Sequence, residues 1–499
     1  MPDDLNTRNV TVSSITIQNP TTGELVGEIS CDTPDSVRAK VAAAHRARRG
    51  WEATPVTERA RLLTLIADQL EAAAEELAEL NHRETGKTVA DSQGGIDAGV
   101  GTLRQYAELG PVHRGHSLRG DRLAADFTRS RARGVVAAIT PWNDPVAIAA
   151  GLIGAALVMG NTVIHKPSER CPHLGRRLGE ICSAVLPEGV FATALGDAEI
   201  GRVLTDDERI AMYAHVGSSA AGRDIHSRAA AHGAHVIREN GGNDALIVDS
   251  GVDIEWAAGQ AALGSFANAG QICTSVERIF VHRDVAADFT SALVAEAEKW
   301  NSAPEPQPLV DRRHRESVQF LLTASWEMGA KVLAGGSIPD TPGAHYPATV
   351  VDHCRPGMPL LTDEVFGPVA PICVADDFDE ALELAAADPY GLAATVLSPD
   401  LGHVLAAVDT LRVGTVKVNA VFGGAPGGSA EPLGESGSGF GFGPELLDEF
   451  STTSVVHISA PPASSGADAS DGPASSSGPA SSSYPASSSG SASSSGPEQ

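Results

Sequence analysis

Hydrophobic positions near the start of the chain recur at helical spacing. Between residues 57 and 81, apolar side chains lie three or four positions apart, as on one face of an α-helix: Leu62, Leu63, Ile66, Leu70, Ala73, Leu77 and Leu80. The sequence Glu-Thr-Gly-Lys at 84–87 is expected to end this helix, and a mostly helical stretch follows to about residue 109. The N-terminal part of the chain is therefore predicted to be helical.

From residue 134 onward, short apolar runs alternate with helical patterns. Strands are predicted at 134–139, 162–165, 190–195, 210–216 and 234–238, with helices at 145–159 and 174–185. A second series has strands at 245–248 and 278–282 and helices at 256–266 and 285–300. Strands that alternate with helices pair in parallel through right-handed crossovers. The pattern predicts an α/β fold with two units, which meet near 239–242.

The last segment of the chain, from residue 460, consists mainly of Pro, Ala, Ser and Gly. A six-residue unit, Gly-Pro-Ala-Ser-Ser-Ser with close variants, recurs there from Gly472 to Ser495. Such a composition offers too little apolar surface to offset the entropy of ordering the chain. Residues 460–499 are predicted to be disordered, and the folded part is expected to end near Ser459.

Composition and charge narrow the class of protein. A chain of 499 residues exceeds what one core usually holds, so two or three structural units are expected. The formal net charge of −27 argues against nucleic acid and anionic membranes as partners, because both attract basic surfaces. No apolar run approaches the about 20 residues that span a bilayer, and the N-terminus lacks a signal-peptide pattern. The six cysteines have neither disulfide-framework nor zinc-site spacing, so we expect a cytoplasmic protein without a structural metal.

Two motifs carry candidate catalytic residues. Cys273 follows a predicted helix in the sequence Gly-Gln-Ile-Cys, where backbone dipoles or a base could make its thiolate a nucleophile. Glu239 lies shortly before a Gly-Gly turn, where a carboxylate could act as a general base. Each alone has an ordinary alternative, since a lone cysteine is more often a small buried hydrophobic residue and a lone glutamate an exposed charge.

Residues between predicted strands and helices supply candidate ligand contacts. Asn143 could donate a hydrogen bond to an oxyanion, although the Asp-Pro pair that follows it would equally suit a helix N-terminus. Lys166 and Glu169 come at the end of a predicted strand and could hold a ribose diol. The small-residue turn at 217–222 opens a helix and could receive a pyrophosphate, which is a weak signal on its own.

The order and spacing of these motifs resemble the aldehyde dehydrogenase superfamily over about residues 15–458. The matching stretches are Pro141-Trp142-Asn143, Lys166-Pro167-Ser168-Glu169, Gly217-Ser218, Glu239-Asn240-Gly241-Gly242, Gly270-Gln271-Ile272-Cys273 and Glu364-Val365-Phe366-Gly367-Pro368. Six motifs in the family's chain order are far more specific than any one of them.

For catalysis, the resemblance implies that Cys273 attacks the aldehyde carbonyl and forms a thiohemiacetal. The Asn143 amide and the Cys273 backbone N–H would hold the oxyanion. Hydride transfer to the cofactor would leave a thioester, and Glu239 would activate water for its hydrolysis.

For the cofactor, the resemblance implies contacts from Pro141, Trp142, Lys166, Ser168, Glu169, Gly201, Gly217, Ser218, Gly241, Glu364 and Phe366. Lys166 and Glu169 would meet the adenosine ribose, and Glu364 the nicotinamide ribose. The pyrophosphate would lie over Gly217 and Ser218. Because Glu169 would repel a 2′-phosphate, NAD is favoured, and NADP stays an alternative.

The family fold implies three parts. A Rossmann-like NAD-binding domain would take residues 1–110 and 132–240, and an α/β catalytic domain would take 241–443. A small β-flap from 111–131 and 444–459, with strands near 119–133 and 451–458, would add strands to a neighbouring subunit. This predicts a homodimer or homotetramer.

Two positions depart from the family pattern. Many relatives carry an aromatic residue where this chain has Asp144 and a Trp where it has Lys417, and in many of them both positions lie near the aldehyde tunnel. Charge in place of aromatic walls favours a polar small aldehyde or a semialdehyde as substrate. The alternative is that Asp144 only caps its helix and Lys417 only meets solvent.

Two other functions stay open. A CoA-acylating dehydrogenase of the same superfamily passes the acyl group to a thiol and typically lacks the base glutamate, so Glu239 argues for hydrolysis. A non-catalytic scaffold on this fold would be expected to have lost Cys273, Glu239 or Asn143, and all three are present.

Overall fold

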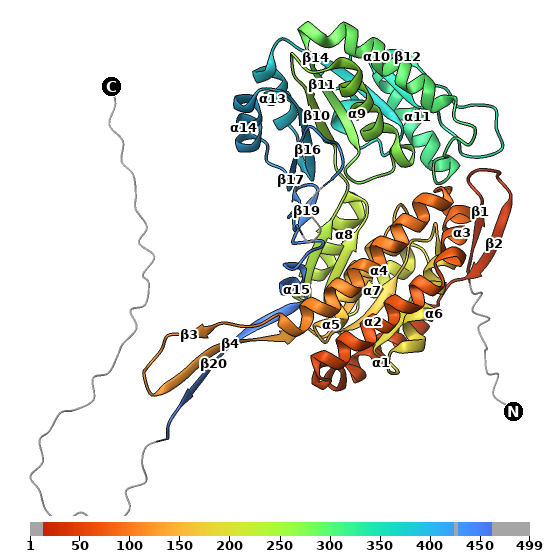
Figure 1. Cartoon of the computed structure of the whole chain (residues 1–499). Helices are drawn as coiled ribbons and strands as arrows, with labels where there is room; N and C mark the ends of the chain where they lie inside the picture. The colour runs from red at the N-terminus through yellow and green to blue at the C-terminus, as the bar shows by residue number, and fades with distance from the viewer. Residues whose placement is uncertain (1–12, 424–427, 462–499) are drawn as a thin grey trace, which may run out of the picture.

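The structure of the protein is a computed structural model that describes residues 13–423 and 428–461. Apart from its first two residues, the tail predicted to be disordered (460–499) lies outside the described residues. Figure 1 shows two α/β units and a long arm of strands that leaves the lower one. The two mainly parallel sheets confirm the predicted α/β fold.

The first unit is built on a six-stranded sheet in the order β19-β9-β8-β5-β6-β7. Its strands are β5 (Val135–Ile139), β6 (Thr162–Lys166), β7 (Phe191–Thr193), β8 (Ile210–Val216), β9 (His235–Glu239) and β19 (Gly437–Ser438). Every pairing is parallel except that of β9 with β19. The five parallel strands are those predicted, whereas β19 comes from a late glycine-rich segment without a strand pattern.

Helices cover both faces of this sheet, because successive positions along its strands belong to two different cores. Val136 and Ala138 pack into one core, and Val135 and Ala137 pack into the other. The first core is covered by α2 (Val56–Ala72), α3 (Ala74–Thr85), α4 (Val89–Val112), α5 (Pro145–Val158) and α6 (Pro172–Val185). The second is covered by α1 (Pro34–Ala53), α7 (Ala198–Thr205) and α8 (Ser219–Ala230).

The N-terminal region differs from the prediction in two places. The helix expected over 57–81 is two helices, α2 and α3, because the chain leaves helical geometry at Ala73 (φ −98°, ψ 8°). The residues before α1 are not helical, since β1 (Ser14–Gln18) and β2 (Leu25–Ser30) form an antiparallel hairpin. The Ile/Thr alternation of β1 favours a strand, but it is short beside the helical periodicity that follows.

The second unit is built on a seven-stranded sheet in the order β12-β13-β14-β11-β10-β16-β17, in which only β12 is antiparallel to its neighbour. The strands are β10 (Asp244–Val248), β11 (Val276–His282), β12 (Lys331–Ala334), β13 (Thr349–Asp352), β14 (Val369–Ala375), β16 (Ala393–Leu397) and β17 (Thr415–Val418). One face is covered by α9 (Ile254–Phe266) and α10 (Arg283–Asn301), and the other by α11 (Arg312–Glu327), α13 (Phe378–Ala386) and α14 (Leu401–Thr410).

Short elements complete the described part of the chain. They are α12 (Pro359–Thr362), the antiparallel pair β15 (Tyr390–Gly391) and β18 (Leu433–Gly434), and α15 (Leu446–Glu449). Within the described ranges, no helix combines the length and apolar character needed to cross a membrane.

A three-stranded antiparallel arm projects from the first unit (Figure 1). β20 (Ser451–Ser459) pairs along its whole length with β4 (Ala124–Ala132), and β3 (Ser117–Leu118) pairs with the other edge of β4. The two strands expected for the flap are therefore present. The arm exposes Leu123, Val455 and Ile458. The domain boundaries inferred from the resemblance stay predictions.

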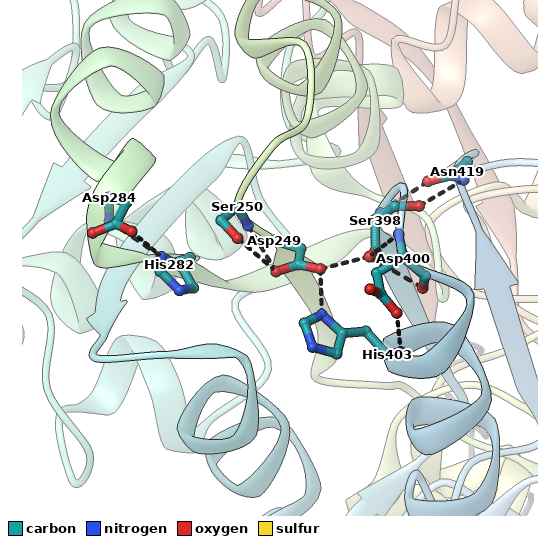
Figure 2. A network of polar contacts seen from close by, with 8 residues as sticks. All are labelled: Asp249, Ser250, His282, Asp284, Ser398, Asp400, His403 and Asn419. Carbon is teal, nitrogen blue, oxygen red and sulfur yellow. Dashed lines mark hydrogen bonds and ion pairs between the residues drawn. The ribbon is translucent and has the colours of Figure 1, made fainter.

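Asp249, just after β10, ties several elements of the second unit together (Figure 2). Its buried carboxylate accepts a hydrogen bond from the Ser398 hydroxyl (2.5 Å) and another from the ring of His403 on α14 (2.6 Å). Asn419, after β17, exchanges hydrogen bonds with the backbone of Ser398. One buried carboxylate therefore links the ends of β10 and β16 to α14.

Candidate active site

The predicted site residues come together between the first and the second unit. In the first sheet, Lys166 and Glu239 are the last residues of β6 and β9, and Asn143 follows β5. The carboxyl ends of parallel strands lie at one edge, where ligands bind in open α/β sheets. In the second sheet, Cys273 lies just before β11. The two units therefore contribute different residues to one place.

A strained loop carries Cys273. After α9, residues 267–270 form a short turn in which Asn268 and Ala269 have φ values of 52° and 53°. Non-glycine residues at positive φ are uncommon and need support from their surroundings. Gln271 supplies it, because its amide donates to the Asn268 carbonyl (2.9 Å) and accepts from the Val310 N–H (2.8 Å). The nucleophile candidate is thus held in a fixed backbone.

The Cys273 thiol lies among carboxylates. Burial raises its pKa, and the charges of Glu239, Asp244 and Glu364 raise it further. Lys417 acts in the opposite direction. The thiol is therefore the resting form at neutral pH, and ionisation needs a base or a nearby positive charge.

Asn143 lies beside the cysteine loop. Its side-chain N–H donates to the carbonyl oxygen of Gln271, two residues before Cys273 (3.3 Å). The next residue, Asp144, holds the N-cap position of α5 with Pro145 in the first turn, but its side chain makes no capping hydrogen bond. It pairs instead with Lys87 (3.2 Å). The alternative that Asp144 only caps its helix is wrong, because this ion pair takes its carboxylate.

Glu239 ends β9 in a setting that suits a proton acceptor. Burial raises the pKa of its carboxyl to about 7, so a small change of pH changes its charge. The carboxylate lies against Gly441, where an added Cβ would be 2.5 Å from Oε2. The Glu239 carbonyl accepts from the Gly217 N–H (3.1 Å), which fixes the end of β9 next to the end of β8.

Glu364 and Phe366 are positioned by a residue that the motifs did not mark. The buried carboxylate of Glu277, on β11, accepts hydrogen bonds from the N–H groups of Val365 (2.6 Å) and Phe366 (2.8 Å). The Glu364 carboxylate lies on the Gly241-Gly242 turn, and burial raises its pKa to about 7. Glu277 therefore fixes the loop that carries Glu364 and Phe366.

Aromatic side chains from both units pack together around Phe366. Trp142 contacts Phe366 edge-on, with 5.6 Å between ring centroids, and His314 at 6.1 Å. The Arg170 guanidinium lies over Trp142 at 5.2 Å and pairs with Asp311 (2.9 Å). This cluster joins the first unit to the second.

The donor set at the carboxyl edge of the first sheet fits a dinucleotide. Lys166 is buried, with its ammonium bonded to the Pro167 carbonyl (3.3 Å), and a Cβ on Gly201 would lie 3.6 Å from its Cε. Ser218 caps α8 by accepting from the Ala221 N–H (3.3 Å), and the helix N-terminus with its free N–H groups suits a pyrophosphate. The Ser168 hydroxyl is used locally, accepting from the Arg170 N–H (3.2 Å).

Lys417 does not simply meet solvent, contrary to the alternative stated above. Its ammonium donates to the Val421 carbonyl (2.8 Å) and lies 5.6 Å from the centroid of the Phe422 ring. Loss of hydration lowers its pKa, while Asp244 and Cys273 oppose this change. A half-buried charge on the edge strand β17 is therefore among the groups that act on the Cys273 thiol.

Sequence reasoning missed Asp244, Gln271 and Glu277 as parts of the site. Asp244 and Glu277 are charged residues within apolar strands, and a charge at a buried strand position is itself a signal of a special environment. Gln271 belongs to one of the motifs, but its role could not be predicted, because it bonds to residues 308–310, which are distant in the sequence.

Comparisons with known proteins all point to one family. The model of the aldehyde dehydrogenase family matches residues 7–456. The betaine aldehyde dehydrogenase of Cereibacter sphaeroides is 35% identical over 424 residues, covering 82% of this chain and 86% of that protein. The NAD+-dependent benzaldehyde dehydrogenase of Pseudomonas putida is 32% identical, covering 90% and 94%.

A solved structure shows the same architecture. The betaine aldehyde dehydrogenase of Staphylococcus aureus in complex with NAD+ superposes with a TM-score of 0.87 at 27% identity. The match covers 91% of this chain and 93% of that one.

Proposed function

Because the chain belongs to the aldehyde dehydrogenase family, we propose that it oxidises its aldehyde to a carboxylic acid with NAD+ and water through Cys273. The chain is an aldehyde dehydrogenase by family, and what we propose is the role of each residue in the reaction. One observation carries these roles. Asn143, from the first unit, bonds to the backbone two residues before Cys273, which belongs to the second.

The first step forms a bond between the Cys273 sulfur and the aldehyde carbon. The thiol proton passes to Glu239, which releases it to solvent before hydrolysis, and as the thiolate attacks, negative charge develops on the former carbonyl oxygen. Asn143 and the Cys273 N–H stabilise that oxygen, once the Asn143 amide releases the Gln271 carbonyl. NAD+, when bound, supplies the hydride acceptor, and a thioester on Cys273 remains.

The second step is hydrolysis. Glu239 takes a proton from a water molecule, and the resulting hydroxide displaces the Cys273 thiolate from the acyl carbon. A carboxyl with a pKa of about 7 is ionised often enough to act as a base and protonated often enough to return the proton.

The cofactor assignment rests on residues at the edge of the first sheet. Lys166 and Glu169 would hold the adenosine ribose, Gly201 would line the adenine side, and the turn from Gly217 to Ser218 would hold the pyrophosphate. Glu364, with Gly241 beside it, would meet the nicotinamide ribose, and the Trp142–Phe366 pair would flank the ring, next to Pro141. A carboxylate at Glu169 favours the 2′-hydroxyl of NAD over the 2′-phosphate of NADP. The named relatives from Pseudomonas putida and Staphylococcus aureus use or bind NAD+.

The proposed substrate is a polar small aldehyde. Lys417 places a half-buried charge that acts on Cys273, and an alkyl chain would gain little from desolvating an ammonium. Because Lys87 neutralises the charge of Asp144, the proposal of a polar substrate rests on Lys417. An aldehyde panel of hexanal, semialdehydes and aminoaldehydes, read by NADH absorbance with NAD+ and with NADP+, measures the preference. Higher kcat/KM for hexanal than for every polar aldehyde would contradict it.

The reaction itself is tested with Cys273→Ala and with product analysis. The variant is expected to lose turnover while still binding NAD+, measured by calorimetry. Carboxylic acid should form in the absence of CoA. Acyl-CoA as the sole product, formed only with CoA present, would instead establish the acylating alternative, which Glu239 argues against.

Assembly through the arm is also proposed. In the described part of the chain, β20 pairs with β4 alone, so its outer edge is open to another strand. Exposed Val455 and Ile458 on that strand support a homodimer or homotetramer in which the arm meets a neighbouring subunit.

A further inference from the structure

The carboxylate of Glu239 occupies a space that Gly441 leaves open. A Cβ added to Gly441 would lie 2.5 Å from Oε2, 2.8 Å from Cδ and 3.1 Å from Oε1 of Glu239, and these are the three atoms nearest to that position. Real Cβ atoms essentially never approach another heavy atom to within 3.0 Å. A residue with a side chain could therefore not stand at position 441 while the carboxylate stays where it is.

The backbone of Gly441 does not itself require a glycine. Gly439 and Gly443, on either side of it, both have a φ of 81°, in the left-handed region that favours glycine. Gly441 is not among the residues at positive φ, so an alanine could adopt its backbone conformation. What requires a glycine at this position is the room that the Glu239 carboxylate takes.

The loop that carries Gly441 is held on both sides of it. Before it, the Phe440 N–H donates to the Glu449 carboxylate (3.3 Å). After it, the Gly443 carbonyl accepts from the buried hydroxyl of Tyr106 (3.2 Å). The strand β19, just before the loop, pairs with β9. The loop is therefore fixed, whereas a glutamate side chain rotates about several bonds, so a new methyl group would displace the carboxylate rather than the loop.

The end of β9, which carries Glu239, lies beside the cysteine loop. Glu239 precedes Gly242 by three residues, so at most about 10 Å of backbone separates them. Cys273 packs on Gly242, where an added Cβ would be 2.9 Å from the Cys273 carbonyl oxygen. This neighbourhood suits a carboxylate that has to hold a water molecule for an acyl group on Cys273.

We propose that Gly441 is a positioning residue for the general base, because its missing side chain leaves the space from which the Glu239 carboxylate activates water. The step itself is the proposed hydrolysis. Glu239 takes one proton from water, and the hydroxide forms a bond to the acyl carbon as the bond to the Cys273 sulfur breaks. The inference rests on the role proposed for Glu239.

The experiment uses Gly441→Ala in the full-length enzyme, with Gly101→Ala as the matched control. Gly101 is an exposed position in α4, where an added Cβ would meet nothing within 4 Å. Gly441→Ala is also made together with Glu239→Gln. Stopped-flow absorbance of NADH, with the panel aldehyde of highest kcat/KM, separates the first turnover from the steady state. Calorimetry measures the affinity for NAD+.

Gly441→Ala is expected to lower the steady-state rate at least about tenfold, since misplacing a catalytic group by about 1 Å can cost that much or more. The rapid NADH burst and the affinity for NAD+ should remain, because the thiol proton can also pass directly to solvent. In Glu239→Gln, which lacks the base, the same change should cost nothing further. Gly101→Ala should leave both phases at the parent rates.

Folding provides a second measurement that needs neither substrate nor cofactor. If Gly441→Ala does not fold, the double variant Glu239→Ala/Gly441→Ala should fold, because no carboxylate remains for the methyl group to meet. Circular dichroism and the melting temperature show this. A double variant that is also unfolded would mean that the methyl group meets other atoms, and the proposal would be wrong.

A parent-like steady state in folded Gly441→Ala, or an equal further loss in the Glu239→Gln background, would overturn the proposal. Failure of the proposed function has a different signature. If Glu239→Gln alone kept the parent steady-state rate, another group would activate water, whatever the result for Gly441→Ala.

Discussion

Burial of Glu239 at the end of β9 gives this residue a pKa near the pH of most cells. We predict that Glu239→Gln forms NADH in a rapid first turnover and then turns over at least about a hundredfold more slowly, since a general base typically contributes that much. In the parent, the steady-state rate should rise with pH through about 7, because only the ionised carboxyl accepts a proton.

Stopped-flow absorbance of NADH, recorded across this pH range, checks both parts of the prediction for Glu239. The variant should lose the rise with pH along with the steady-state rate. An unchanged steady state in Glu239→Gln would show that another group activates water.

Single residues differed in how far the sequence revealed them. Cys273, Asn143 and Glu239 were selected by their motifs, and the structure brings them together, although their catalytic roles stay proposals. Asp244 and Glu277 could not be selected, because a carboxylate inside a strand gains its meaning from the loops that reach it. The Val365 and Phe366 N–H groups that Glu277 binds come from 88 and 89 residues away.

At the scale of elements, the buried carboxylate of Asp249 holds α14 through the ring of His403 (Figure 2). The hydrogen bond from His403 to Asp249 raises the pKa of the histidine above its usual value of 6.5. Stabilisation from the charged ring is therefore fully present below that value, and is lost as pH rises through the higher folded pKa. His403 also stacks on Phe378, with 4.1 Å between centroids.

We predict that His403→Gln lowers the melting temperature at pH 5.5 more than at pH 9. The side chain of His403 is 40% exposed, so after allowance for solvent screening the charge is worth about 1 kcal/mol or less. Glutamine keeps an N–H donor but carries no charge, which isolates the electrostatic part. Scanning calorimetry at both pH values measures it, and an equal loss at both would refute the assignment.

Elements with long or strongly apolar patterns could be predicted from the sequence. Elements that depend on contacts with distant parts of the chain could not. The five parallel strands of the first sheet, the strands β10 and β11 of the second, and helices such as α5 have strongly apolar local patterns and were predicted, whereas β12, β13, β14, β16 and β17 were not. The break between α2 and α3 was not predicted either, because Ala73 has a side chain that suits a helix and the apolar face continues past it. The strand β19 depends on an edge of β9, roughly 200 residues earlier, which no local pattern records.

At the scale of the whole molecule, the arm predicts how copies associate. Val455→Lys combined with Ile458→Lys should shift the protein toward monomer, because two charges would be placed on the exposed strand β20. Light scattering after size exclusion measures the mass. Leu401→Lys, at an exposed position on α14, is the matched control and should keep the parent mass.

A monomeric parent would contradict assembly through the arm, and so would a double variant that stays fully associated. Activity of the dissociated variant is a second readout. If the site is complete within one chain, monomers should keep part of the turnover.

The division of the reaction centre between the two units has a consequence for how such enzymes diversify. The proposed nucleophile Cys273 and Lys417 come from the second unit, whereas Asn143, Glu239 and the proposed dinucleotide-binding edge come from the first. A hybrid gene that joins the first unit of one relative to the second unit of another would inherit its coenzyme preference and the reactivity of its cysteine from different parents. Recombination at 239–242 would therefore change the coenzyme preference and the reactivity of the cysteine independently of each other.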